Sequence, residues 1–143
     1  MLKNFLSIVL IVISVPMQAQ NKIVLQVTNF ESSKGVCRAC LFNNAADFNG
    51  KGGKAYQCKQ VVVTNKTALV AFENIPAGNF AISVFHDENN NNKLDLNFLG
   101  IPKEGYGASK NKLPFASAPD YKENSFVLPD KGVTNLSIRL RNL

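Results

Sequence analysis

Histidine, cysteine and tryptophan are scarce in this 143-residue chain, which contains one, three and none of them, respectively. The single histidine, His86, ends an apolar segment, where a lone imidazole commonly hydrogen-bonds a neighbouring turn. No serine lies in the G-x-S-x-G context that activates a nucleophile in many hydrolases. These absences argue against an enzyme that hydrolyses its substrate through a catalytic triad.

Long hydrophobic runs are also lacking, apart from one at the start of the chain. Residues 5–15 are apolar except for two serines, Lys3 precedes them, and Ala19 provides a small residue for cleavage. The run is shorter than the roughly 20 residues that cross a membrane. We therefore expect residues 1–19 to be a signal peptide, with no cysteine after it to carry a lipid. Residues 20–143 then form one secreted or periplasmic domain.

The chain has no dense basic patch, although its formal charge is +6. Removing Lys3 with the signal peptide leaves +5, and the remaining lysines are scattered along the sequence without an aromatic-basic motif. A nucleic-acid-binding surface concentrates such charges. We expect no nucleic-acid partner and interpret the charge as a solvated surface.

Helical periodicity is nearly absent, and short segments with alternating apolar residues take its place. In the first of them Ile23, Leu25 and Val27 share one face. Turn residues separate the candidate strands, which cover residues 22–30, 35–42, 58–65, 67–74, 79–86, 125–129 and 133–140. The third and fourth form a hairpin that turns near Asn65 and Lys66, and residues 42–50 could hold one helical turn. About seven strands predict an all-β fold, a single antiparallel β-sandwich.

One connection, residues 87–124, is far longer than the roughly 12–15 residues typical of loops without a function of their own. Three prolines stiffen it. Its apolar residues predict an ordered loop anchored on one end of the sandwich; they are Leu94, Leu96, Phe98, Leu99, Ile101, Tyr106, Phe115 and Tyr121.

The segment "HDENNNNKLD" opens this connection and has the spacing of a calcium loop. Side-chain oxygens fall at the first, third, fifth and ninth positions, and the backbone carbonyl of the seventh residue faces the same centre. Calcium takes about six to eight hard oxygen ligands and accepts amides beside carboxylates. The sequence therefore predicts a Ca²⁺ site formed by Asp87, Asn89, Asn91, Lys93 and Asp95.

Two positions depart from the calcium-loop pattern. Asn92 replaces the glycine of the sixth position, where the backbone must be left-handed, and asparagine is the next most tolerant residue. Phe98 stands where a bidentate glutamate is expected, so a further ligand must come from elsewhere, with Glu104 and Glu88 the nearest carboxylates. The alternative is an asparagine-rich turn whose side chains hydrogen-bond their own backbone.

The cysteines predict a disulfide. Cys37 and Cys40 lie three apart in a candidate strand and therefore face opposite sides, so a bridge between them is awkward. Export favours a bond from Cys58 to one of them. We favour Cys37–Cys58, because Cys37 shares the inward face with Ala39 and Leu41. A redox motif, or a zinc site built from all three cysteines and His86, is a less favoured alternative.

The segment "FENIPAGNFAISVFHDENNNNKLDLNFLGIPKEGYGAS" resembles the domain-of-unknown-function 2141 family of small secreted bacterial proteins. The family pattern includes V-x-H-D-E-N-x-N-x-K-x-D followed by G-I-P-x-E-G-[YF]-G-x-S. The chain departs from it at Phe80, where tyrosine is favoured, and at Asn92, where glycine is favoured. The resemblance implies an immunoglobulin- or transthyretin-like β-sandwich and export, and it implies no particular activity.

These observations lead to two hypotheses about function. The first is a secreted or periplasmic calcium-binding β-sandwich, monomeric and non-catalytic, that binds an envelope or extracellular protein or glycan or serves a structural role. The second is an exported glycan-active enzyme that uses Glu104 with Asp120 or Asp87, which would need carboxylates about 5–10 Å apart across a cleft.

Overall fold

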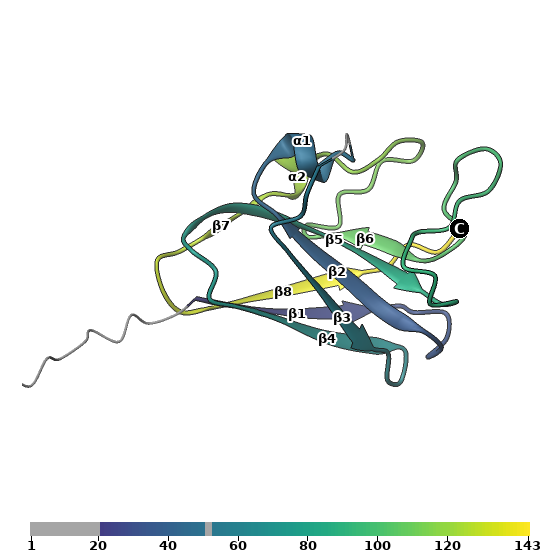
Figure 1. Cartoon of the computed structure of the whole chain (residues 1–143), viewed down its shortest axis with the longest axis horizontal. Helices are drawn as coiled ribbons and strands as arrows, with labels where there is room; N and C mark the ends of the chain where they lie inside the picture. Colours follow the sequence, from purple (N-terminus) through teal and green to yellow (C-terminus); the bar gives the residue numbers. More distant parts are fainter. Residues whose placement is uncertain (1–20, 51–52) are drawn as a thin grey trace, which may run out of the picture.

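The protein is described by a computed structural model that covers residues 21–50 and 53–143, so the predicted signal peptide lies outside the described residues (Figure 1). Eight strands and two short helices form the described part of the chain. In order they are β1 Lys22–Thr28, β2 Val36–Phe42, α1 Ala45–Phe48, β3 Gln57–Val62, β4 Thr67–Glu73, β5 Gly78–Asp87, β6 Tyr106–Ala108, α2 Tyr121–Asn124, β7 Phe126–Leu128 and β8 Val133–Arg139. No helix in these ranges is long and apolar enough to span a membrane.

The strands form two sheets, which confirms the predicted all-β sandwich. One sheet has the order β4-β1-β8, and the other has the order β3-β2-β5-β6 with β7 paired to the start of β5. Every pair of strands is antiparallel except β1 and β8, which run parallel. The exception arises because the last strand crosses over from the other sheet and lies beside the first (Figure 1). The structure has one strand more than the seven that the sequence predicts. This strand is β6, and it was not predicted because it has only three residues and contains a glycine.

The core lies between the two sheets, where the alternating apolar residues meet. Ile23, Leu25 and Val27 of β1 point inward, as the sequence predicts, and they are fully buried. Across the sandwich, Ala39 and Leu41 of β2 are buried in the same way. Because side chains alternate along a strand, each sheet keeps one face for the core and one for solvent.

The predicted turn between β3 and β4 is confirmed. Asn65 and Lys66 both have positive φ, 51° and 58°, and the backbone groups of Thr64 and Thr67 bond each other on either side. Two left-handed residues in a row are typical of the tight hairpin turn that matches the strand twist. Beyond this turn β3 and β4 separate and join different sheets, so the hairpin connects the two layers.

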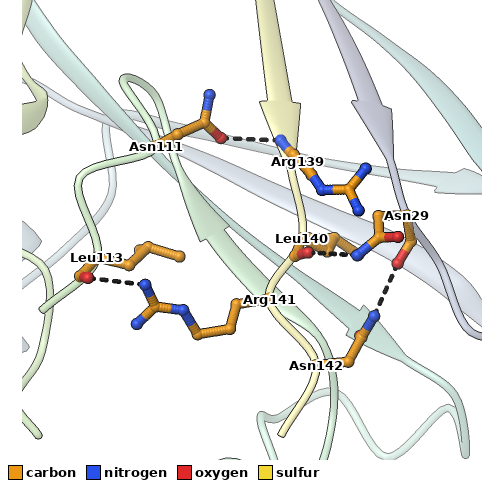
Figure 2. A pocket seen from close by; sticks show the side chains of 7 residues that line it. All are labelled: Asn29, Asn111, Leu113, Arg139, Leu140, Arg141 and Asn142. Atoms are coloured by element: carbon orange, nitrogen blue, oxygen red, sulfur yellow. Dashed lines mark hydrogen bonds between the residues drawn. The ribbon is translucent and has the colours of Figure 1, made fainter. Parts of the chain in front are cut away.

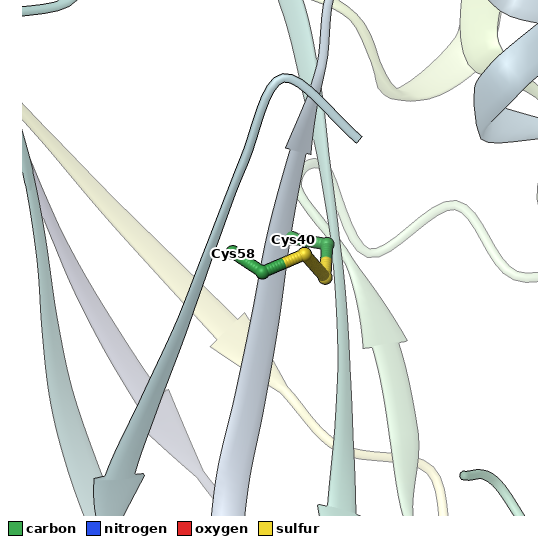
Figure 3. The surroundings of a disulfide bond; sticks show 2 residues. All are labelled: Cys40 and Cys58. Atoms are coloured by element: carbon green, nitrogen blue, oxygen red, sulfur yellow. A yellow bond between two sulfur atoms is a disulfide. The ribbon is translucent and has the colours of Figure 1, made fainter. Parts of the chain in front are cut away.

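Cys58 forms a disulfide, but its partner is Cys40 rather than the predicted Cys37 (Figure 3). Cys40 lies directly opposite Cys58 in the β2–β3 register, with the two Cα atoms 4.1 Å apart. Cys37 lies opposite Val61, and its side chain points into the core, where it is a free, buried thiol. Cys58 is on the outer face of its sheet, out of reach of Cys37. The bond also uses two of the three thiols that a zinc site would need.

The long connection is ordered, yet most of its predicted apolar anchors are exposed, so that part of the prediction is wrong: Leu96, Phe98, Leu99, Ile101 and Phe115 face solvent. Polar groups hold the connection instead. The buried side chain of Asn124 accepts the N–H groups of Lys110 and Lys112 and donates to the carbonyls of Lys112 and Asp120. An amide can satisfy donors and acceptors of a loop backbone together, which an apolar side chain cannot.

The C-terminal end of β8 lies beside a hollow of about 530 Å³ (Figure 2). Its lining residues come from the residue after β1, from the long connection and from the C-terminal segment; they are Asn29, Asn111, Leu113, Arg139, Leu140, Arg141 and Asn142. The side chain of Asn111 donates to the carbonyl of Ser137 and accepts the N–H of Arg139. Asn111 thereby satisfies two backbone groups of β8 that face the outer edge of the three-stranded sheet. The guanidinium of Arg141 donates to the carbonyls of Leu113 and Pro114.

Candidate metal centre

The predicted calcium loop begins where β5 ends, at Asp87. The last residue of β5 still pairs with Val36 of β2, which fixes the first position of the loop on the five-stranded sheet. Gly35 packs against this point with φ +63°, and a Cβ there would lie only 2.1 Å from the carbonyl oxygen of Asp87. Only glycine allows the two chain segments to approach so closely.

The carboxylate of Asp87 is completely buried, and both of its oxygens accept hydrogen bonds. Its Oδ1 accepts the N–H of Asn91 at 3.0 Å, and its Oδ2 accepts the N–H of Asn92 at 3.0 Å. Oδ2 also accepts from Nε of Arg38 at 2.5 Å, and the same guanidinium donates to Oδ1 of Asn92. Arg38 therefore joins the loop to β2 and supplies a positive charge to the buried acid.

The pKa of Asp87 reflects a competition between burial and these partners. Burial by itself raises the pKa, because it disfavours the charged form. The hydrogen bonds from Arg38, Asn92 and Asn91, together with the charge of Arg38, outweigh burial and hold the pKa of Asp87 below its usual value. Asp87 is thus an anion at neutral pH.

The side chains of Asn89, Asn91 and Asp95 turn toward one another. The amide of Asn89 donates to Oδ2 of Asp95 at 2.6 Å, and the amide of Asn91 lies 2.8 Å from Oδ1 and 3.0 Å from Oδ2. The hydrogen bonds from Asn91 and Asn89 lower the pKa of Asp95; partial burial opposes them, and the charges of Lys103 and Lys93 assist. The amide nitrogens of Asn89 and Asn91 therefore meet at the carboxylate of Asp95.

Hydrogen bonds to the backbone are present in the same loop. Oδ1 of Asn89 accepts the N–H of Asn91 at 3.2 Å, and Oδ1 of Asn91 accepts the N–H of Lys93 at 3.1 Å. These bonds are the ones expected for an asparagine-rich turn. They leave a second lone pair on each amide oxygen. The loop is therefore held by its own hydrogen bonds, with an acceptor position left on each amide oxygen.

The backbone of the loop is left-handed at two asparagines. Asn92, at the sixth position, has φ +69°, the left-handed conformation for which calcium loops use glycine. Asn90 is left-handed as well, with φ +58°. Asparagine tolerates this conformation better than other residues with a Cβ. The run of asparagines therefore supplies both the side-chain amides and the backbone freedom.

Glu104 lies against the loop, as predicted, and contacts its backbone. One oxygen accepts the N–H of Glu88 at 3.1 Å, and the other accepts the N–H of Asp95 at 3.0 Å. Glu88 turns away and accepts from the hydroxyl of Ser32. Glu104 thus ties the two ends of the loop together, while Glu88 is not directed at the centre.

The donor set fits a calcium ion only with the help of amide and carbonyl oxygens. Within residues 21–50 and 53–143 no group of three or more His, Cys, Asp and Glu side chains lies close enough to hold a metal. Asp87 and Asp95 would be the charged ligands, and Asn89, Asn91 and the carbonyl of Lys93 the neutral ones. Arg38, which lies 49 residues from Asp87, was missed because no local spacing connects the two positions.

Glu104 and Asp120, two of the carboxylates that the enzyme hypothesis would use, accept hydrogen bonds from backbone N–H groups. Glu104 uses both oxygens in this way, and Asp120 caps α2 by accepting the N–H of Glu123 at 3.2 Å. Neither residue lines the hollow of Figure 2 or the smaller one beside β1, β4 and β8. The geometry adds no support for catalysis.

His86 has the structural role expected for a lone histidine. Its Nε2 lies 2.7 Å from the carbonyl oxygen of Lys34, and its ring packs edge-on against Phe30. The imidazole is buried between the end of β5 and the turn before β2. These contacts give His86 a structural role at the start of the loop.

The fold and the loop define a small β-sandwich domain with an acid-and-amide loop at the end of β5. The family model described as "uncharacterized protein conserved in bacteria" (DUF2141) matches residues 25–136, and the chain belongs to this family. No curated protein and no solved structure matched the chain. Membership confirms the resemblance found in the sequence.

Proposed function

We propose that the protein is an exported, calcium-binding β-sandwich that acts as a non-catalytic binding or structural module. The observation that supports this most directly is the convergence of Asn89, Asn91 and Asp95 beside a left-handed Asn92. The disulfide between Cys40 and Cys58 agrees with an oxidising compartment outside the cytosol.

The charges of the loop argue for modest affinity. Arg38 already neutralises part of the charge of Asp87, and Lys93 and Lys103 lie near Asp95. Calcium affinity falls with fewer charged ligands, and modules outside the cell bind with Kd values of about 10⁻⁴–10⁻³ M. Such affinity suits a compartment in which calcium is abundant, where the ion acts as a structural part rather than a signal.

A bound ion would stiffen the base of the long connection. Its ligands would come from both ends of the loop, so residues 87 to 95 would be fixed relative to β5. A partner would then bind a surface that is already ordered. The entropic cost of ordering the loop on binding would be smaller, and the affinity would be higher.

Calcium at about ten times its Kd is expected to stabilise the fold by about 1.4 kcal/mol, which raises the melting temperature by roughly 5 °C. Asp95→Asn removes a charged ligand while keeping the shape of the side chain, so this variant is expected to lose the calcium-dependent shift. Differential scanning calorimetry with calcium and with chelator measures the effect, and isothermal titration gives the Kd.

Glu88→Gln is the matched control, because Glu88 belongs to the same loop but bonds Ser32 instead of the centre. It should shift with calcium as the wild type does. A wild-type melting temperature that is the same in calcium and in chelator contradicts the proposal and leaves the self-bonded asparagine turn. Equal loss in Glu88→Gln and Asp95→Asn would indicate diffuse screening by calcium rather than a site.

A further inference from the structure

Residues 95–103 form a small hairpin that projects from the long connection, here called the finger (Figure 1). The N–H of Lys103 donates to the carbonyl of Asp95 at 2.8 Å, and the N–H of Asn97 donates to the carbonyl of Ile101 at 2.8 Å. Leu96 and Pro102 pair as an isolated bridge between these bonds. The finger therefore has two short arms that hold each other.

The tip of the finger is a rigid turn. The N–H of Gly100 donates to the carbonyl of Asn97 at 3.0 Å, and Gly100 is left-handed with φ +78°. The side chain of Asn97 accepts the N–H groups of Leu99 at 2.9 Å and Ile101 at 3.0 Å. A three-residue hairpin loop that ends in a left-handed glycine is a common stable form. The tip is thus ordered by its own hydrogen bonds.

This rigid tip presents large apolar side chains to solvent. Phe98 is 95% exposed and Leu99 is 68% exposed, and Leu96 and Ile101 beside them are exposed as well. Single exposed apolar residues are ordinary, but a group of them on one ordered projection marks an interaction site. The hydrogen bonds of Asn97 fix the backbone that carries these exposed side chains.

We propose that the finger inserts Phe98 and Leu99 into the surface of an anionic lipid bilayer. A narrow convex tip suits insertion between lipid headgroups, whereas a stable protein interface needs about 800 Å² on each partner. Because the tip is already ordered, insertion fixes few additional side-chain or backbone angles.

The charges around the finger favour an anionic surface. Lys93 and Lys103 are exposed, and neither forms an ion pair with any described residue. The acids at the base are turned inward, where Asp95 bonds Asn89 and Asn91 and Glu104 bonds the backbone. Lysines beside an apolar tip are attracted to anionic lipid headgroups. This inference does not depend on calcium, because the bonds that shape the tip lie outside the calcium loop.

Vesicle co-sedimentation of the full mature chain in the presence of chelator tests the proposal. Vesicles of equal parts phosphatidylglycerol and phosphatidylcholine should bind the wild type, and vesicles of phosphatidylcholine alone should bind it less. Phe98→Ser is expected to weaken binding about tenfold or more, since the lost apolar surface no longer enters the bilayer. Leu99→Ser and Leu69→Ser form a matched pair, because Leu69 on β4 is 69% exposed but lies on a sheet face. Only Leu99→Ser should weaken binding.

The absence of tryptophan allows a second, direct measurement. Phe98→Trp creates a single indole at the tip, and its emission should shift to the blue when anionic vesicles are added, while that of Leu69→Trp should not. Both variants replace exposed residues, so a normal melting temperature verifies folding.

The proposal is overturned if the wild type stays in the supernatant with anionic vesicles, or if Phe98→Ser binds as well as the wild type. It is also overturned if the emission of Phe98→Trp does not shift. Gel filtration that shows a dimer which Phe98→Ser dissociates, without vesicle binding, would assign the tip to self-association instead.

Discussion

Removing the disulfide by Cys40→Ala together with Cys58→Ala is expected to lower the melting temperature by roughly 10 °C. The bond closes a segment with a sequence separation of 18. A cross-link of this span removes unfolded-state entropy worth about 3 kcal/mol. For a domain of this size that loss shifts the midpoint by about the stated amount. Thermal unfolding followed by circular dichroism measures it.

Single-cysteine variants identify the partner of Cys58. The wild type and Cys37→Ala should both lose stability when a reducing agent is added, whereas Cys40→Ala should not respond. Burial raises the pKa of the Cys37 thiol to about 12, so this thiol should react with labelling reagents only after unfolding. If Cys37→Ala abolished the effect of the reducing agent, the bond would instead join Cys37 and Cys58.

Arg38→Met is expected to destabilise the fold by about 3 kcal/mol. The substitution keeps an unbranched apolar stem but leaves the buried carboxylate of Asp87 without its cation, and breaking one side of a buried ion pair costs about 3–5 kcal/mol. The lower end applies because the Arg38 side chain is 20% exposed. Urea unfolding at neutral pH gives the free energy directly.

Lys22→Met is the matched control, since Lys22 pairs with Glu73 on the exposed surface at 3.3 Å. Exposed pairs contribute about 0–1 kcal/mol, so this variant should stay close to the wild type. Equal losses in Arg38→Met and Lys22→Met would mean that the buried pair has no special role.

The same pair makes stability depend on pH in a defined direction. Asp87 has a lowered pKa in the folded protein, so it contributes stability that is present above its unfolded pKa of about 3.9 and is lost as the pH falls through the folded value. Arg38→Met removes the main partner that lowers this pKa. The fall in stability on acidification should therefore be smaller in Arg38→Met than in the wild type.

Strands and turns could be predicted because their signals are local. The alternation of Ile23, Leu25 and Val27 and the turn at Asn65 and Lys66 each depend on a few neighbouring residues. The disulfide partner could not be predicted this way, because it depends on the register between β2 and β3. A pattern gives the face of a residue, but the residue opposite it is set by the pairing of two strands.

The candidate site was predictable in part for the same reason. The spacing from Asp87 to Asp95 is local, so the sequence could indicate a loop in which Asn89 and Asn91 lie beside Asp95; calcium binding there stays a prediction. Arg38 is distant in the sequence and was missed. The exposed tip was also missed, since apolar residues in a long loop suggest burial. The turn that carries Phe98 is shaped by the hydrogen bonds that Asn97 accepts from Leu99 and Ile101, and the amino-acid composition of the loop does not indicate these bonds.

The outer edge of β8 has a consequence for how the protein behaves in a crowded compartment. An uncovered strand edge invites another chain to add a strand, and repeated addition produces fibres. Asn111 bonds Ser137 and Arg139 at this edge, so its side chain stands in for part of a missing strand. Because Asn111 already bonds these two backbone groups, they are not available for pairing with a strand of another chain.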